Sequence, residues 1–72
     1  MRVQAGVTPR YEDGTPLSWS TKGDELFEVQ DEVDPPAWVG EQEGEWVVGR
    51  LRWADGHCGC WVPKAALREE DA

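Results

Sequence analysis

The apolar pattern of the chain is strongest between residues 44 and 63, GEWVVGRLRWADGHCGCWVP. Residues 46–51 are rich in aromatic and β-branched side chains, which favour extended structure. Asp55-Gly56 is typical of a tight turn with positive φ, and residues 58–62 supply a returning strand that Pro63 ends. The pattern predicts a β-hairpin that carries three of the five tryptophans, at positions 46, 53 and 61.

The N-terminal third predicts one short strand and a long connection. Residues 2–7 alternate apolar and polar side chains and predict a strand that Pro9 ends. Residues 10–16, RYEDGTP, are turn-forming in composition and predict a loop. Residues 17–19 predict a short extended piece, in which Leu17 and Trp19 anchor the loop.

Further elements follow on either side of the hairpin. Residues 21–24 predict a turn with Gly23 at positive φ, and residues 25–33 predict a strand. Residues 37–44 either extend that strand or form a long loop that carries Trp38. A single helical turn is expected over 64–67. Several short strands with closely spaced turns predict an all-β fold, a small barrel or sandwich.

Length and charge limit the classes of function. A chain of 72 residues is one domain, with its core expected over 3–69 and a charged tail after it. The net charge of −8 disfavours nucleic acid, anionic membranes and phosphorylated cofactors as ligands, and it favours a protein or peptide of basic character. We expect no cofactor. No stretch is apolar enough to span a membrane or resembles a secretion signal, so we expect a cytoplasmic protein or a domain of a longer chain.

The two cysteines allow a metal-site hypothesis. Cys58 and Cys60 share one face of the predicted strand, and a disulfide between them would be strained, so we expect reduced thiols. Together with His57 they could suggest a metal site. However, His57 is expected on the opposite face, and structural zinc takes four ligands. We therefore favour small apolar side chains under a sheet and no metal.

Several segments occur in the order in which a known family carries similar ones: Tyr11, LSW at 17–19, KGDEL at 22–26, WVVGR at 46–50, WVP at 61–63 and Leu67. Over residues 7–67 the chain resembles SH3 domains, where the corresponding segments are the second Tyr of ALYDY, LSF, KGDEL, the start of the third strand, and YIP with the apolar position after it. The resemblance implies an SH3-like barrel of about five strands with one 3₁₀ turn near the C-terminus. It also implies a peptide groove lined by Tyr11, Trp46 and Pro63.

The chain departs from the SH3 pattern at three positions. Pro9 stands in place of the first Tyr of ALYDY, Ala66 in place of the Tyr after the proline, and Cys60 in place of a Gly. The departures remove two groove aromatics and weaken the expectation of a proline-rich ligand. Residues 37–40 and 63–67 also resemble segments of plasmid-encoded type II dihydrofolate reductases, which are tetrameric SH3-like barrels. Their VQIY motif would fall on GCWV at 59–62, so that activity is not expected.

The candidate ligand-binding residues combine aromatic and acidic side chains. Trp46 is expected to present its ring and its indole N–H to a ligand, with packing in the core as the alternative. Tyr11 either lines the groove or packs against the protein, and Trp38 offers a second anchor if it is exposed. Acidic residues near Tyr11 could pair with basic groups of a partner, namely Glu12, Asp13, Asp24 and Glu25. Their alternative role is to keep the loops solvated.

Three hypotheses about function follow. The first is a non-catalytic protein-interaction module that binds a basic, extended or proline-containing segment, acting as a monomer or weak homo-oligomer. The second is an acidic inhibitor of phage or mobile-element type that mimics nucleic acid on a basic surface. The third is a structural barrel within a larger assembly. Catalysis is not expected, because no nucleophile motif or phosphate-binding loop occurs and the acidic segment 40–44 would repel phosphate.

Overall fold

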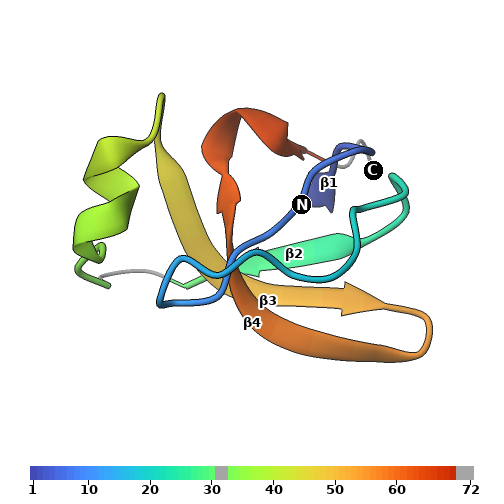
Figure 1. Ribbon diagram of the computed structural model, residues 1–72. Coiled ribbons are helices and arrows are strands. Elements are labelled where there is room, and N and C mark those ends of the chain that lie inside the picture. Colours follow the sequence, from blue (N-terminus) through green and yellow to red (C-terminus); the bar gives the residue numbers. More distant parts are fainter. Residues whose placement is uncertain (31–32, 70–72) are drawn as a thin grey trace.

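A computed structural model describes residues 1–30 and 33–69 as a single curved antiparallel sheet (Figure 1). The strand order is β4-β3-β2-β1-β5. The elements along the chain are β1 (Arg2–Val3), β2 (Leu26–Val29), the 3₁₀ helix η1 (Ala37–Glu41), β3 (Trp46–Trp53), β4 (Gly56–Pro63), the 3₁₀ helix η2 (Lys64–Ala66) and β5 (Leu67–Arg68). The predicted all-β fold of about five strands, with a 3₁₀ turn near the C-terminus, is confirmed.

The predicted hairpin is the longest element of the sheet, but its turn differs from the prediction. β3 and β4 pair from Trp46 opposite Pro63 to Trp53 opposite Gly56. The two turn residues are therefore Ala54 and Asp55, and Gly56 is already in β4 rather than at positive φ. A Cβ on Gly56 would lie 3.3 Å from Cζ2 of Trp53, so the missing side chain makes room for the neighbouring ring.

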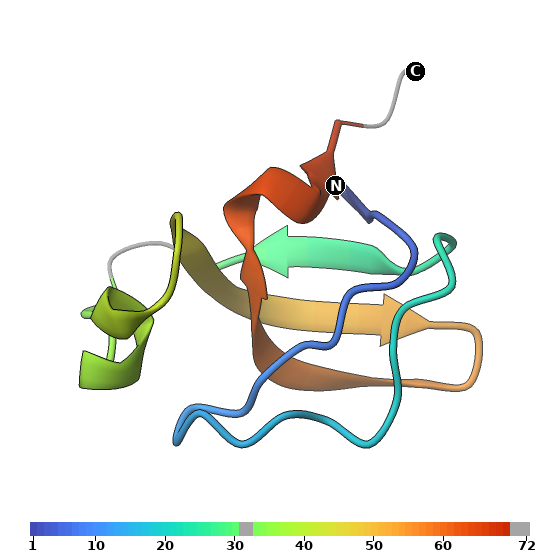
Figure 2. The same ribbon diagram turned by 45° about the horizontal axis from the view of Figure 1, so that its top comes forward.

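The segment after β1 crosses to the outer edge of β4 and covers part of it (Figure 2). The Arg10 N–H donates to the Trp61 carbonyl oxygen at 2.9 Å, and the Trp61 N–H donates back to the Arg10 oxygen at 2.8 Å. At the other end of the sheet, β5 pairs with β1. These contacts curl the sheet and cover an edge that could otherwise pair with another chain.

The core lies on the concave side of the sheet. Its buried members come from strands and from the long connection: Val3, Leu17, Phe27, Leu51, Cys60 and Val62. Val47 and Cys58 pack against this cluster, as expected from the alternation of side chains along β3 and β4. Pro9 is also fully buried. Pro9 therefore contributes its apolar surface to the interior.

Four stretches were predicted wrongly in extent or in type. The strand expected over 2–7 ends at Val3, because the chain turns at 5–6, where Gly6 has φ 81°. The strand expected over 25–33 covers only 26–29, and residues 31–32 of that prediction lie outside the described part of the chain. Residues 37–41 form η1, a helix that was not predicted within either alternative for 37–44. The expected extended piece over 17–19 is not formed, because residues 18–19 form a bend, although Leu17 is buried as expected.

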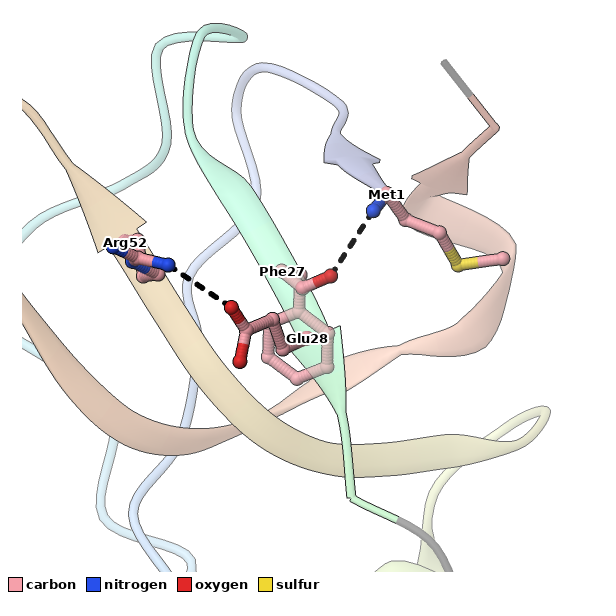
Figure 3. A network of polar contacts seen from close by, with 4 residues as sticks. All are labelled: Met1, Phe27, Glu28 and Arg52. Atoms are coloured by element: carbon pink, nitrogen blue, oxygen red, sulfur yellow. Dashed lines mark hydrogen bonds and ion pairs between the residues drawn. The ribbon is translucent and has the colours of Figure 1, made fainter.

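Polar contacts fasten β2 to the elements beside it (Figure 3). The N-terminal ammonium of Met1 donates to the Phe27 carbonyl oxygen at 3.1 Å, and the Phe27 N–H donates to the Met1 oxygen at 2.7 Å. Nη1 of Arg52 on β3 lies 3.0 Å from Oε1 of Glu28. Both of these side chains are exposed, so the ion pair contributes only about 0.2–1 kcal/mol.

Candidate functional site

Four side chains gather beside the open end of the β3–β4 hairpin, and we call them the tryptophan cluster: Arg10, Trp38, Trp46 and Trp61. Trp46 is the first residue of β3 and stands directly opposite Pro63, the last residue of β4. The Lys64 N–H donates to the Glu45 carbonyl oxygen at 2.8 Å and closes this end of the hairpin. The structure therefore brings together Trp46 and Pro63, two of the three residues expected to line the groove.

Trp38 reaches the cluster from η1. Its ring meets Trp46 edge to face, with centroids 5.5 Å apart and planes at 77°, and it meets Trp61 at 6.0 Å and 79°. Such pairs contribute about 0.5–1.5 kcal/mol each beyond the burial of their surface. Val39, the next residue, is buried and fixes η1 against the protein. Trp38 is thus part of the same surface as Trp46.

Trp38 also holds the loop that carries the predicted acidic residues. Its Nε1 donates to the carbonyl oxygen of Glu12 at 2.7 Å. A Cβ on Gly14 would come within 3.1 Å of Cγ of Trp38, and Gly14 has φ 91°, so glycine is favoured there on both counts. The indole N–H of Trp38 is therefore used inside the protein. Among the described residues, the Nε1 of Trp46 has no acceptor and remains the donor that a ligand could use.

The candidate ligand-binding residues chosen from the sequence included neither the buried Trp61 nor Arg10. Arg10 lies against two rings of the cluster. Its Cζ lies 5.7 Å from the ring centroid of Trp38 and 5.6 Å from that of Trp46, within the range of cation–π attraction. Its Nη1 donates to the Gly14 carbonyl oxygen at 3.3 Å. The residue that fixes its backbone, Trp61, is far away along the chain, and no local pattern connects the two. The only available signal was a basic residue adjacent to Tyr11.

Tyr11, Glu12 and Asp13 lie on the loop beside the cluster, and all three are exposed. The Tyr11 side chain is 48% exposed, while its backbone N–H donates to the Thr15 oxygen at 2.8 Å. Oδ1 of Asp13 accepts the Thr15 N–H at 2.9 Å, and this hydrogen bond lowers the pKa of Asp13. The predicted aromatic and acidic positions of this loop are therefore accessible next to the cluster.

Asp24 and Glu25 do not belong to this surface. Glu25 is only 3% exposed, and its carboxylate accepts the N–H groups of Lys22 and Gly23 at 2.9–3.1 Å. Burial raises the pKa of Glu25, but these backbone donors outweigh it, and the pKa lies below its ordinary value. The prediction that Glu25 pairs with a partner is wrong, because its carboxylate binds the protein's own backbone. Asp24 is exposed but lines a hollow beside Trp53, at the opposite end of the hairpin.

Trp61 is the buried member of the tryptophan cluster, with 3% of its surface exposed. Its Nε1 is buried and, among the described residues, has no hydrogen-bond acceptor. Leaving such a donor unpaired costs about 1–3 kcal/mol. Trp38 therefore rests on a ring that is held by packing rather than by a polar contact.

The metal hypothesis for His57, Cys58 and Cys60 gains no support from the geometry. His57 is exposed on the opposite face from Cys58 and Cys60, which pack on the core, as the alternation predicted. Burial raises the pKa of Cys60 to about 12 and also raises that of Cys58, so neither thiol is disposed to ionise. Within residues 1–30 and 33–69, no three His, Cys, Asp or Glu side chains are placed to hold a metal ion.

None of the helices in the described part of the chain has the length and apolar character needed to cross a membrane. No protein family, curated protein or solved structure was found to match this chain.

Proposed function

We propose that this chain is a non-catalytic protein-interaction module of the SH3-like type, which binds an extended segment of a partner protein at the tryptophan cluster. The observation that carries the proposal is the joining of Trp38, Trp46 and Pro63 from three separate parts of the chain at one surface. Rigid aromatic side chains supply contact area at low entropic cost, and they dominate the energetics of many interfaces. The SH3-like segments, which follow one another along the chain in the same order as in SH3 domains, support the same function.

The positions of the charges suggest how a ligand would lie. The Arg10 guanidinium stands against Trp38 and Trp46, so a basic ligand side chain is disfavoured at the centre of the cluster. Glu12 and Asp13 are exposed at its rim. We therefore place an apolar or proline residue of the ligand on Trp46 and Pro63, and a basic side chain beside the acidic loop. Rim pairs of this kind affect specificity and association rate more than affinity.

The acidic inhibitor that mimics nucleic acid is the competing proposal. Exposed carboxylates in several parts of the described chain favour it, among them Glu12, Asp13, Asp34, Glu41, Glu43, Glu45 and Asp55. For such a protein, affinity would depend on many charges together and would fall steeply with salt. For an interaction module, affinity would depend on Trp46 and would fall only moderately with salt.

The test is a selection of binding peptides from a displayed random library, followed by titrations with the best synthetic peptide. Trp46→Ala should reduce affinity by at least about tenfold, as expected for an aromatic anchor. Replacing Glu12 and Asp13 by Gln and Asn should weaken binding severalfold, whereas Asp55→Asn removes an exposed charge at the turn end of the hairpin and should not.

Two outcomes would reject the interaction module. Peptides that bind Trp46→Ala as well as the wild type, and whose affinity falls steeply with salt, would favour the mimic. A selection that yields no binding peptide, from protein whose fold is verified by NMR, would favour the structural barrel.

A further inference from the structure

A hollow of about 390 Å³ lies at the turn end of the β3–β4 hairpin, away from the tryptophan cluster. Its walls come from the chain before β2 and from the hairpin turn: Trp19, Ser20, Lys22, Asp24, Glu25, Trp53, Ala54 and Asp55. Trp53 ends β3, whereas Trp46 begins it. Seven steps of about 3.3 Å along the strand place these two residues about 23 Å apart. The hollow is thus a separate surface, beside the turn between β3 and β4, whose place in the fold can be followed in Figure 1.

Two tryptophans form a corner in this hollow. The rings of Trp19 and Trp53 have centroids 5.1 Å apart and planes at 71°. Both are half-buried and pack partly against the core, which fixes their orientation. Gly56 leaves the space that the Trp53 ring occupies, since a Cβ there would lie 3.3 Å from the ring. The corner is therefore built into the fold rather than formed by mobile surface side chains.

The charge around the corner is negative. Three carboxylates line the hollow, from Asp24, Glu25 and Asp55, against the single ammonium of Lys22. The Glu25 carboxylate is occupied by backbone N–H groups, and its pKa is lowered, so it is ionised near neutral pH. Asp24 and Asp55 are exposed. The hollow thus combines π faces, which attract cations, with a net negative field.

We propose that this hollow binds a quaternary ammonium group, with Trp19 and Trp53 contacting its methyl groups and Asp24 and Asp55 balancing its charge. A methylated cation fits because Trp19 and Trp53 offer π faces to its methyl groups, while the acceptors of Glu25 are already used by backbone N–H groups. Such a group can come from a trimethylated lysine of a partner or from a free molecule such as choline. The proposal does not depend on ligand binding at the tryptophan cluster.

The test compares choline with 3,3-dimethyl-1-butanol, which has the same shape but no charge. Protein labelled with ¹⁵N is titrated, and the indole N–H signals of the five tryptophans are followed. Choline should shift the signals of Trp19 and Trp53 in a saturable manner, and the alcohol should bind at least about tenfold more weakly. A trimethyllysine peptide titrated in parallel identifies the source: tighter binding than choline indicates a protein ligand, and equal or weaker binding a small molecule.

Matched variants locate the effect. Asp24→Asn and Asp55→Asn should each weaken choline binding about two- to fivefold, within the range expected for exposed charges, whereas Asp34→Asn, outside the hollow, should not change it. Trp46→Ala should bind choline like the wild type, which separates this site from the tryptophan cluster. Equal binding of choline and the alcohol would overturn the proposal. So would the absence of any shift at Trp19 and Trp53 with both choline and the trimethyllysine peptide.

Discussion

Gly49 offers the sharpest test of how β2 and β3 are packed. It is buried within β3, opposite Val29 on β2 and Cys60 on β4. A Cβ built on Gly49 would overlap the carbonyl oxygen of Glu28 and would lie 2.9 Å from Cε2 of Phe27. The carbonyl belongs to the backbone of the neighbouring strand, so a change of rotamer cannot relieve the overlap. The substitution Gly49→Ala must push β2 away from β3 or distort the ladder between them.

The expected cost is at the upper end of the range for overpacked cores, about 3 kcal/mol. For a domain of this size, 1 kcal/mol corresponds to about 4–8 °C in Tm, so Gly49→Ala should melt about 12–24 °C below the wild type. The assay is thermal unfolding followed by circular dichroism, with urea unfolding as an independent measure of the free energy.

Gly59→Ala is the matched control, because Gly59 lies on β4 and pairs with Arg50, next to Gly49 on β3. It is exposed, and the nearest atom to an added Cβ is 4.0 Å away. Its φ is not in the left-handed region, so alanine there should be neutral or stabilise by up to about 1 kcal/mol. If both variants melt within a few degrees of each other, the close approach of β2 to Gly49 is wrong.

Three further predictions concern single side chains. Trp38→Phe keeps a ring but removes the hydrogen bond to the Glu12 oxygen, so amide exchange over residues 11–15 should become faster, at a stability cost of about 1 kcal/mol; unchanged exchange would contradict the contact. Glu25→Gln should cost about 1.5–3 kcal/mol at pH 7, the value for charge-assisted hydrogen bonds. Because the folded pKa of Glu25 lies below its ordinary 4.5, this stabilisation is full above pH 4.5 and is lost as the pH falls through the folded pKa; urea unfolding at pH 3 and pH 7 should therefore show a smaller deficit for the variant at pH 3, and equal deficits would refute the assignment. Burial raises the pKa of Cys60 to about 12, so native protein at pH 8 should resist iodoacetamide at Cys60 until it unfolds; rapid alkylation read by mass spectrometry would contradict its burial.

The parts of the fold that sequence could predict are those governed by local chemistry. The alternation over 46–51 and 58–62 located the hairpin, and Gly23 takes the positive φ, 105°, expected of its turn. The helix η1 was missed because a 3₁₀ segment of five residues has no hydrophobic period to detect. Gly56 was predicted to be a turn residue from its type, but it lies in β4. A glycine is favoured there because a Cβ would crowd the Trp53 ring.

In the candidate site, too, features that depend on local sequence could be predicted and features that depend on tertiary contacts could not. Trp46 and Pro63 were expected on one surface from the resemblance to SH3 domains. The predicted turn at Asp55-Gly56 would have paired Trp46 with Ala65, and only the observed turn places Trp46 opposite Pro63. Arg10 could not be placed, because its neighbours Trp38 and Trp46 reach it only through the folding of the long connections. Glu25 was misassigned for a related reason. An acidic residue two or three positions after backbone N–H groups can serve as their acceptor, and composition does not distinguish that role from an exposed charge.

The most direct test of the central claim, that the tryptophan cluster is the ligand-binding surface, is an NMR titration of ¹⁵N-labelled protein with the selected peptide. The account predicts saturable shifts of the indole N–H signals of Trp38 and Trp46, with the signals of Trp19 and Trp53 unchanged, and loss of this response in Trp46→Ala. Peptide binding that moves only Trp19 and Trp53, or that spreads small shifts over all exposed acidic segments, would contradict it.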